Sequence, residues 1–121
     1  MYKIVFYKDR NGKRPVADYF KELAGNTDKG SRIKLDKIHD YIETLKASGT
    51  RIGEPYVKHL SGEIWELRPL KDRILFAAWD GSKFILLHHF VKKTQKTPPG
   101  EIKKAKRNLS DFRKRSADDN G

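Results

Sequence analysis

The sequence predicts an α+β domain: an antiparallel sheet of four to five strands with two N-terminal helices on one face and a basic C-terminal helix. Apolar residues recur at helical spacing through residues 15–47. The pattern then changes, between residues 56 and 91, to β-branched and aromatic runs separated by turn signals. A chain of 121 residues has room for one domain of ordinary size. We expect this single domain to cover residues 1–116 and residues 117–121 to form a frayed tail.

The N-terminal part of the chain predicts one strand and two helices. Residues 2–7 are mostly aromatic and β-branched and precede a turn-forming stretch, which is typical of a strand. A short helix over 15–24 begins at a proline, which the first helical turn tolerates because its missing N–H has no partner there. An apolar stripe over 29–47 indicates a longer helix, and Gly49 lies where helices commonly end.

The remainder of the chain predicts four strands and a last helix. The predicted strands cover residues 56–60, 63–68, 72–79 and 83–91, and the predicted basic helix covers residues 101–113. The helix follows a proline-bounded segment, because prolines commonly separate one element from the next. Hairpin connections between these strands would make an antiparallel meander, which gives the two N-terminal helices a sheet to pack against.

Turn signals also predict the register of the meander. Asp80-Gly81 is among the strongest signals for a two-residue hairpin loop, and this loop would place Arg73 opposite His88. A four-residue loop at 69–72 would in turn pair Arg68 with Arg73. Two arginines and one histidine would therefore line up across three adjacent strands on one face.

The composition restricts the function classes. Lys and Arg number 27 and Asp and Glu number 16, which gives a formal charge of +11 and predicts attraction to polyanions. The chain has no cysteine, which excludes disulfides, thiolate zinc sites and thiol nucleophiles. No apolar stretch approaches the roughly 20 residues that span a bilayer. We therefore expect a soluble cytoplasmic protein that does not associate with membranes.

The charged face of the meander is the main candidate site. Arginine presents a fixed fork of donors that matches phosphate oxygens, and histidine titrates near physiological pH. Arg68, Arg73 and His88 therefore predict an anion pocket, and Lys92 has the same parity as His88 and could reach it. In the alternative interpretation, Glu66 neutralises the two arginines in a structural ion pair of modest value.

Further residues around this face are candidates for RNA binding. They are Lys58 and His59 beside the 63–68 strand, Phe90 as a base-stacking ring, and Lys93 and Lys96 after the last strand. A lysine run can equally be a solvated strand end. We expect neither a metal nor a cofactor, because the histidines have no spaced carboxylate partner and the chain has no glycine-rich phosphate loop.

Two motifs carry a family resemblance. The Trp-Glu-Leu-Arg run of residues 65–68 and the Phe-Val-Lys-Lys-Thr-Gln-Lys-Thr-Pro run of residues 90–98 resemble the HigB-type branch of the RelE/ParE toxins. That branch includes the phage-derived Gp49-like proteins. The Arg-Pro-Val-Ala-Asp-Tyr-Phe stretch of residues 14–20 resembles their first helix, and the likeness extends over about residues 2–113.

This resemblance implies a RelE/ParE-like fold and a toxin of a type II toxin–antitoxin system. Such toxins are ribosome-dependent, metal-independent mRNA endonucleases that halt translation. The resemblance also implies a helix-turn-helix antitoxin of the HigA type, which we expect to form a heterotetramer with the toxin. By position, Arg73 corresponds to the arginine used against the scissile phosphate, with Arg68 and Lys92 near it.

The acid–base residues do not follow from the resemblance. RelE has lysines on the strand where this chain has Ile64 and Glu66, and no tyrosine follows Val91 to replace that of RelE. His88 is our candidate for general acid or base because such catalysis is most effective when the pKa lies near the working pH. Glu66 is the less favoured base, and orienting an arginine is its expected task.

Two other functions fit the same predicted fold. One is inhibition of DNA gyrase through a protein interface, as in ParE-like members, and the other is nucleic-acid binding without catalysis. The convergence of Arg73, His88 and Lys92 favours the nuclease. The basic side chains of the last helix could dock on ribosomal RNA, face solvent or bind the antitoxin.

Overall fold

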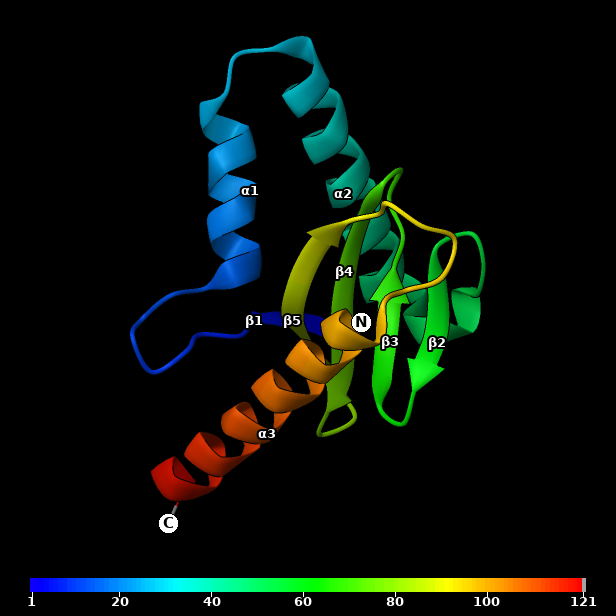
Figure 1. Cartoon of the computed structure of the whole chain (residues 1–121). Helices are drawn as coiled ribbons and strands as arrows, with labels where there is room; N and C mark the ends of the chain where they lie inside the picture. Colours follow the sequence, from blue (N-terminus) through cyan, green and yellow to red (C-terminus); the bar gives the residue numbers. More distant parts are fainter. Residues whose placement is uncertain (121) are drawn as a thin grey trace.

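The computed structural model describes residues 1–120, with side chains described as far as Ala117 (Figure 1). Its elements follow the chain in this order: β1 (Lys3–Phe6), α1 (Pro15–Gly25), α2 (Lys29–Ser48), the 3-10 turn η1 (Gly49–Ile52), β2 (Val57–Ser61), β3 (Ile64–Leu67), β4 (Asp72–Trp79), β5 (Lys83–Val91) and α3 (Pro99–Asn120). The α+β class is therefore confirmed. The predicted boundaries of β4 and β5 are those observed, and most of the others differ by one or two residues.

The strands form one five-stranded sheet in the order β1-β5-β4-β3-β2. The prediction of an antiparallel sheet is wrong for β1, which pairs parallel to β5 with Lys3 opposite Lys83 and Phe6 opposite Leu86. A parallel neighbour needs a long connection, and here the chain passes through α1, α2 and the strands β2 to β4 between β1 and β5. The sheet is therefore mixed, with β1 at one edge and β2 at the other.

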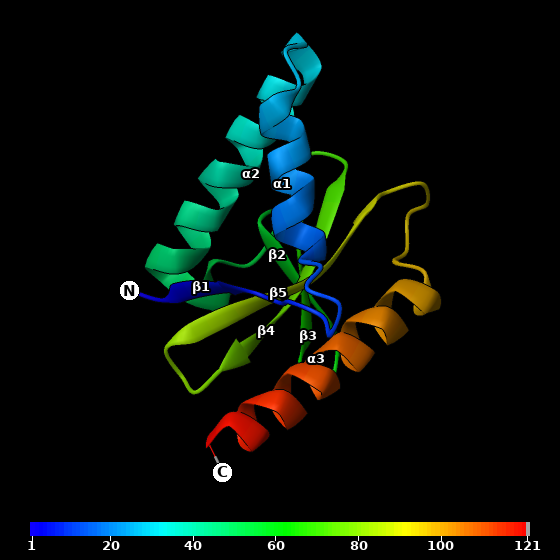
Figure 2. The same cartoon turned by 90° about the vertical axis from the view of Figure 1, so that its left-hand side faces the viewer.

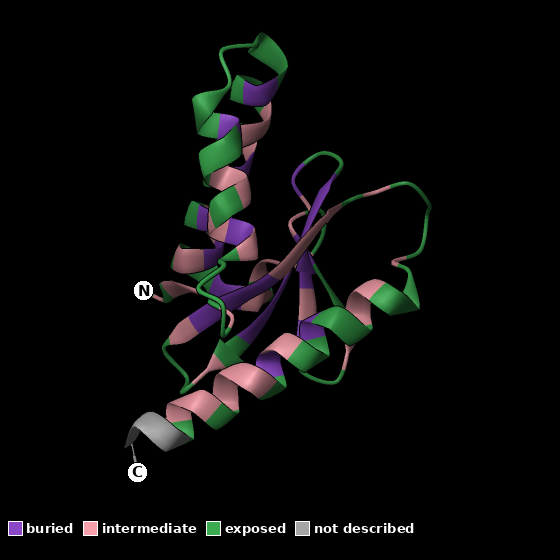
Figure 3. Ribbon diagram, turned by 60° about the vertical axis from the view of Figure 1, so that its left-hand side comes forward, coloured by how far each residue is buried: buried purple, intermediate pink, exposed green. Residues whose placement is uncertain are grey.

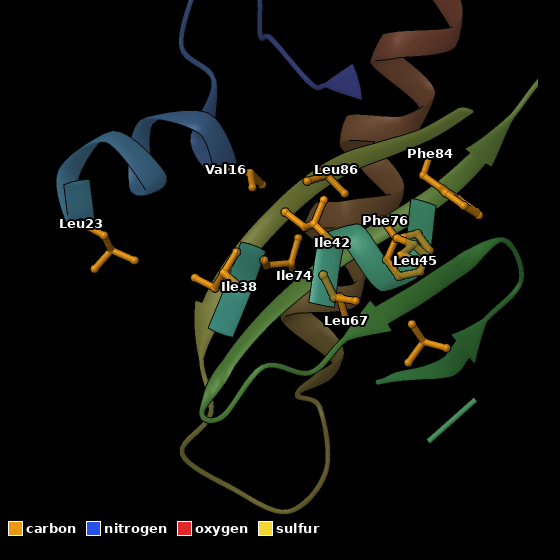
Figure 4. Packing of buried hydrophobic residues seen from close by; sticks show 11 residues of the cluster. Val16, Leu23, Ile38, Ile42, Leu45, Leu67, Ile74, Phe76, Phe84 and Leu86 are labelled. Carbon is orange, nitrogen blue, oxygen red and sulfur yellow. The ribbon is translucent and has the colours of Figure 1, made fainter. Parts of the chain in front are cut away.

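Helices cover both faces of the sheet (Figure 2). α1 and α2 pack on one face, where Ile38 and Leu45 of α2 lie fully buried against Ile74 and Phe76 of β4. Figure 4 shows this cluster, with α1 contributing Val16. The sheet therefore has one deep apolar core on this side, which fixes the orientation of β4.

The second face of the sheet is covered by α3 alone. Ala105 and Leu109 of this helix are buried against Leu75 of β4 and Leu87 of β5. Figure 3 shows α3 lying along this face with exposed residues on its outer side. One helix covers less of a sheet than two. Polar side chains therefore occupy the part of this face that lies beyond the first turn of α3.

Local contacts fix both ends of α2. The Asp28 carboxylate accepts the backbone N–H of Ser31 at 2.8 Å and caps α2. The helix ends at Gly49, whose φ of +68° favours glycine. A Cβ there would lie 2.9 Å from the Tyr2 ring, so glycine also allows the N-terminal segment to pack beside α2.

Side-chain hydrogen bonds from the middle of α3 hold this helix to the rest of the molecule. The Tyr7 hydroxyl donates to Asp111 at 2.6 Å, and burial together with this bond raises the pKa of Tyr7 to about 12. Asn108 donates to the Leu87 carbonyl at 2.9 Å. The helix runs to Asn120, beyond the Arg113 end that we predicted.

The division into a domain of residues 1–116 and a frayed tail of residues 117–121 stays a prediction, and residue 121 lies outside the described part of the chain. None of the helices in residues 1–120 combines the length and apolar character needed to cross a membrane.

The β4–β5 hairpin differs from its predicted register at the turn. Trp79 lies opposite Lys83, so three residues connect the strands and not two. The Asp80 carboxylate accepts from the Ser82 hydroxyl at 2.6 Å and from Lys83 Nζ at 2.8 Å. These contacts stabilise the wider turn that the Asp-Gly signal alone did not indicate.

A β-bulge at Leu87 shifts the same register once more. Phe76 pairs with Leu86, whereas Leu75 pairs with His88. The predicted opposition of Arg73 and His88 is therefore wrong, because Arg73 lies opposite Phe90. The wider turn and the bulge together move the pairing by two residues, so Arg73 and His88 still share the face that α3 covers.

Candidate functional site

The site lies on the α3 side of the sheet, where β3 and β5 end and β4 begins, and Arg73 is its centre. Arg73 is the second residue of β4 and is only 6% exposed. Its Nη1 donates to the carbonyl oxygens of Leu70 at 2.8 Å and Asp72 at 2.9 Å. Nη2 makes no hydrogen bond with any residue that the structure describes. The guanidinium is therefore held rigidly, with one nitrogen still able to bind an anion.

Glu66 lies between the two arginines. Its Oε1 is 3.5 Å from Nε of Arg68 and 3.8 Å from Nε of Arg73, and its side chain is 2% exposed. Burial lowers the pKa of the Arg73 guanidinium and the Arg68 charge lowers it further, while the Glu66 charge opposes both effects. The structural ion pair, which the sequence left as an alternative, is present, and Glu66 holds two like charges in one place.

Arg68 follows the last residue of β3. The three observed pairs of β3 and β4, including Leu67 with Ile74, follow the register that we predicted for this hairpin. Arg68 itself lies beyond the ladder, and its Nη1 is 3.1 Å from the exposed Glu54 carboxylate. The side chain is therefore shared between Glu54 and Glu66, and it supports the site from its rim.

His88 and Phe90 bring β5 to the same face. His88 Nε2 lies 2.8 Å from Oε2 of Glu101 in the first turn of α3. The rings of His88 and Phe90 are stacked with centroids 6.1 Å apart. Glu101 fixes the orientation of the imidazole through Nε2, whereas Nδ1 makes no hydrogen bond with any residue that the structure describes.

Residues Lys92–Pro98, here called the strap, cross over Arg73 between β5 and α3. The Thr97 hydroxyl donates to Glu66 Oε2 at 2.5 Å and holds the end of the strap against the sheet. The pocket beneath it is lined by Arg73, Phe90, Lys92, Lys93, Thr94, Gln95, Lys96, Thr97 and Pro98. The enclosed space is about 10 Å³, which is the room of a single water molecule at most.

The remaining predicted RNA-binding residues divide between the two faces. Lys58 of β2 lies opposite Glu66, so it shares the face of the site and is exposed there. His59 lies on the other face, with its ring against Trp65 and its Nε2 2.7 Å from the Gly62 carbonyl. The structure therefore brings Lys58, Phe90, Lys92, Lys93 and Lys96 to the site and leaves His59 out.

The sequence prediction missed two functional neighbours of the site, Glu101 and Thr97. Both follow β5 and contact residues far away in the sequence, 13 positions for His88–Glu101 and 31 for Glu66–Thr97. The acidic residue in the first turn of an otherwise basic helix was the one available signal for Glu101. Thr97 lies within the motif of residues 90–98, but no local pattern indicates its contact with Glu66, because that partner is set by the path of the strap.

The second histidine of β5 also has a carboxylate partner that was not predicted. His89 faces α1, where its ring stacks on Tyr19 with centroids 3.6 Å apart. Its Nε2 is 3.1 Å from Asp72 Oδ1, which also accepts from the Tyr19 hydroxyl at 2.8 Å. Among the described residues, no three histidine or acidic side chains gather closely enough to hold a metal ion.

Residues 26–110 match the protein family described as Phage derived protein Gp49-like (DUF891). The chain belongs to this family. The Gp49-like region contains β2 to β5 and the first turns of α3, so every residue of the site described above lies within it. The resemblance to the branch of toxins that includes the Gp49-like proteins is thereby confirmed. No curated protein matches the chain significantly.

Proposed function

We propose that this Gp49-like protein is the toxin of a type II toxin–antitoxin system and cleaves mRNA on the ribosome without a metal ion. One observation carries the proposal: a buried arginine with a free Nη2 borders a pocket whose rim supplies Lys92, Lys93 and Lys96. His88 lies on the same face. In this proposal the partners are mRNA, the ribosome and a HigA-like helix-turn-helix antitoxin in a heterotetramer, and the protein acts in the cytoplasm.

The reaction that fits this site is a transesterification within the RNA. The 2′-hydroxyl loses its proton and its oxygen attacks the adjacent phosphorus, forming a P–O bond. The bond to the 5′-oxygen breaks, and that oxygen takes up a proton. The products are a 2′,3′-cyclic phosphate and a 5′-hydroxyl, and no oxidant or second substrate is needed.

Arg73 is proposed to stabilise the negative charge that develops on the phosphate oxygens, an effect commonly worth several kcal/mol. Arg68 and Lys92 add positive charge around the same phosphate. His88 is proposed for one of the two proton transfers, with Glu101 holding its ring. Glu66 is proposed as a positioning residue and not as a base, because both of its oxygens are engaged by the arginines and Thr97.

Access of a phosphate to Arg73 requires the Thr97 end of the strap to move. A phosphate group cannot enter a cavity of about 10 Å³, so Arg73 becomes accessible only when the strap is displaced. The connection to break is the side-chain hydrogen bond of Thr97 to Glu66, whereas the bond from the Lys92 amide to the Lys71 carbonyl at 2.7 Å lies at the other end of the strap and can stay in place. The strap residues are mostly exposed, so moving them disturbs little of the core.

Primer extension on a defined mRNA in a translating cell-free extract tests the function. Wild type, Arg73→Ala and Arg73→Lys are compared, with circular dichroism and thermal unfolding to show that each variant folds. We expect discrete ribosome-dependent cuts with wild type, a loss of at least 100-fold with Arg73→Ala, and partial activity with Arg73→Lys, which keeps the charge but not the fork.

Three outcomes would contradict this proposal in whole or in part. Full activity in a folded Arg73→Ala variant would remove Arg73 from the chemistry. An absence of cuts with folded wild-type protein would favour gyrase inhibition or nucleic-acid binding without catalysis. Cuts on ribosome-free mRNA would keep the chemistry but contradict the dependence on the ribosome.

A further inference from the structure

Leu70, in the turn between β3 and β4, has a backbone conformation and a solvent exposure that are both unusual for leucine. Its φ of +56° lies in the left-handed region, where the Cβ crowds the backbone and glycine or asparagine is usual. Its side chain is also 49% exposed, so burial does not account for leucine at this position. A residue that gains from neither its backbone nor its burial is a candidate for a functional contact.

The turn around Leu70 is rigidly held. The carbonyl of Pro69 accepts from the Asp72 amide at 3.0 Å and that of Lys71 from the Lys92 amide at 2.7 Å. The Leu70 carbonyl itself accepts from Nη1 of Arg73 at 2.8 Å. All three turn carbonyls are therefore bonded, and the Leu70 side chain is held beside the proposed catalytic arginine.

A groove opens between this turn and the strap. It is lined by Leu70, Lys71, Lys92, Lys93, Thr94 and Gln95, and we call it the Leu70 groove. Its volume is about 430 Å³, and it is open to solvent. Unlike the pocket over Arg73, it is accessible without movement of the strap. Among the described residues that line it, three are lysines and none is acidic.

We infer that the Leu70 groove holds one nucleotide of single-stranded RNA next to the scissile phosphate. Phosphates would lie against the lysines and the face of the base against the Leu70 side chain, the combination of charge and apolar contact that single-stranded nucleic acids require. The inference rests on the proposed function and extends it, because it assigns the neighbouring subsite and a residue that contacts substrate there. The Leu70–Arg73 bond keeps the two subsites at a fixed spacing.

Leu70→Gly separates this role from a structural one. Glycine accepts a φ of +56°, so the variant keeps the turn and we expect its Tm to be unchanged or higher. The binding probe is a fluorescein-labelled 2′-O-methyl heptaribonucleotide, which lacks the nucleophilic hydroxyl and cannot be cut. By fluorescence anisotropy, we expect about fivefold weaker binding for Leu70→Gly and nearly wild-type binding for Leu70→Met, which keeps an apolar side chain.

Two control variants, Ile33→Ala and Lys21→Gln, and one further test variant, Lys71→Gln, make the binding measurement specific. Ile33→Ala removes an equally exposed apolar side chain, also 49% exposed, from α2 and should leave binding unchanged. Lys71→Gln should lower the slope of log K against log salt concentration by about 0.7, as for one lost phosphate contact to a single strand. Lys21→Gln, on α1, removes the same charge and should not change the slope.

Wild-type affinity in the folded Leu70→Gly variant would overturn the inference. Equal losses of Tm and of binding affinity in both Leu70 variants would mean that Leu70 has a structural role. This result would also overturn the inference. The probe reports binding without cleavage, so the result is distinguishable from failure of the proposed function. If wild type cuts mRNA and Leu70→Gly binds the probe normally, the nuclease stands and the groove assignment fails.

Discussion

At the scale of single residues, two adjacent charged residues at the start of β4 are buried on opposite faces of the sheet. Arg73 and its partner Glu66 face α3, whereas the preceding residue, Asp72, faces α1 and α2. Asp72 is fully buried, and its Oδ1 accepts from Tyr19 while Lys34 Nζ lies 3.8 Å away. Because Nη1 of Arg73 bonds the Asp72 carbonyl, the two networks share one stretch of backbone.

Asp72 predicts a pH dependence of folding. Burial on its own raises the pKa of this carboxyl, but hydrogen bonds from His89 and Tyr19 and the Lys34 charge outweigh it, so the pKa lies below its ordinary value of 3.8. A carboxyl whose pKa is lower in the folded state stabilises the fold above its unfolded pKa, and this contribution is lost as the pH falls through the folded pKa. Wild type should therefore lose stability below about pH 4.

Asp72→Asn should abolish that part of the acid sensitivity. We expect its free energy of unfolding at pH 7 to be lower by about 2 kcal/mol, because hydrogen bonds to a charged acceptor are weakened. Urea unfolding at pH 3, 4, 5 and 7 measures both effects, and Asp40→Asn, an exposed position of α2, is the control. An Asp72→Asn variant with a wild-type slope between pH 5 and pH 3 would show that Asp72 does not carry the dependence.

The sequence could predict the residue types of the site but not all of their contacts. Strand parity alone predicts that Arg68, Arg73, His88 and Lys92 lie on one face of the sheet. The observed β4–β5 register differs from the predicted one by two residues, and such a shift leaves each side chain on the same face. The Glu66 contacts were foreseen as an alternative, because one pleat separates Glu66 from Arg68. Glu101 and Thr97 could not be found this way, since they reach the site only through the path of the strap and the packing of α3.

At the scale of elements, the strap is the part of the site with the fewest attachments. Thr97 holds it to Glu66 through one short hydrogen bond to a buried charged oxygen. Such a bond typically contributes 1.5–3 kcal/mol. The strap therefore sets how often Arg73 is uncovered.

Thr97→Val should loosen the strap without disturbing the core. Valine has nearly the same shape but no hydroxyl, so we expect hydrogen exchange of the amides in residues 92–97 to accelerate by about tenfold or more. Hydrogen exchange followed by mass spectrometry measures this change. Thr94→Val is the control, because the Thr94 hydroxyl bonds only the Lys96 carbonyl within the strap. Equal exchange in the two variants would contradict the proposed role of Thr97.

An element could be predicted from the sequence where its own residues determine its structure. It could not be predicted where packing against distant parts of the chain determines it. The periodicity of α2 and the Gly49 signal fixed that helix to within one residue. The partner of β1 is not encoded in its own four residues, because β5 follows only after two helices and three further strands. The sequence does not indicate the bulge at Leu87. Ile85, Leu86 and Leu87 are all apolar and are buried on both faces of the sheet, so the run shows no alternation of apolar and polar residues.

At the scale of the whole molecule, the positive charge is unevenly distributed between the two layers. Residues 15–48, which form α1 and α2, contain six basic and six acidic residues and are neutral overall. Residues 92–117, which form the strap and most of α3, contain ten basic and two acidic residues, a net charge of +8 out of +11. The layer that carries the proposed active site therefore faces solvent with most of the excess charge.

This asymmetry predicts that the location of charge, and not its total, governs attraction to RNA. Lys103, Arg107 and Lys114 are exposed on α3, and Lys21, Lys29 and Arg32 are exposed on the neutral layer. Replacing either set by glutamine lowers the net charge by the same three units. Only the α3 set should weaken ribosome binding, reducing the slope of log K against log salt by about 2 if each residue contacts one phosphate. Sedimentation of the protein with ribosomes across a salt series measures this slope.

Equal reductions in the two triple variants would mean that the long-range field of the whole molecule governs binding, because a field that acts at a distance does not depend on which layer carries the charge.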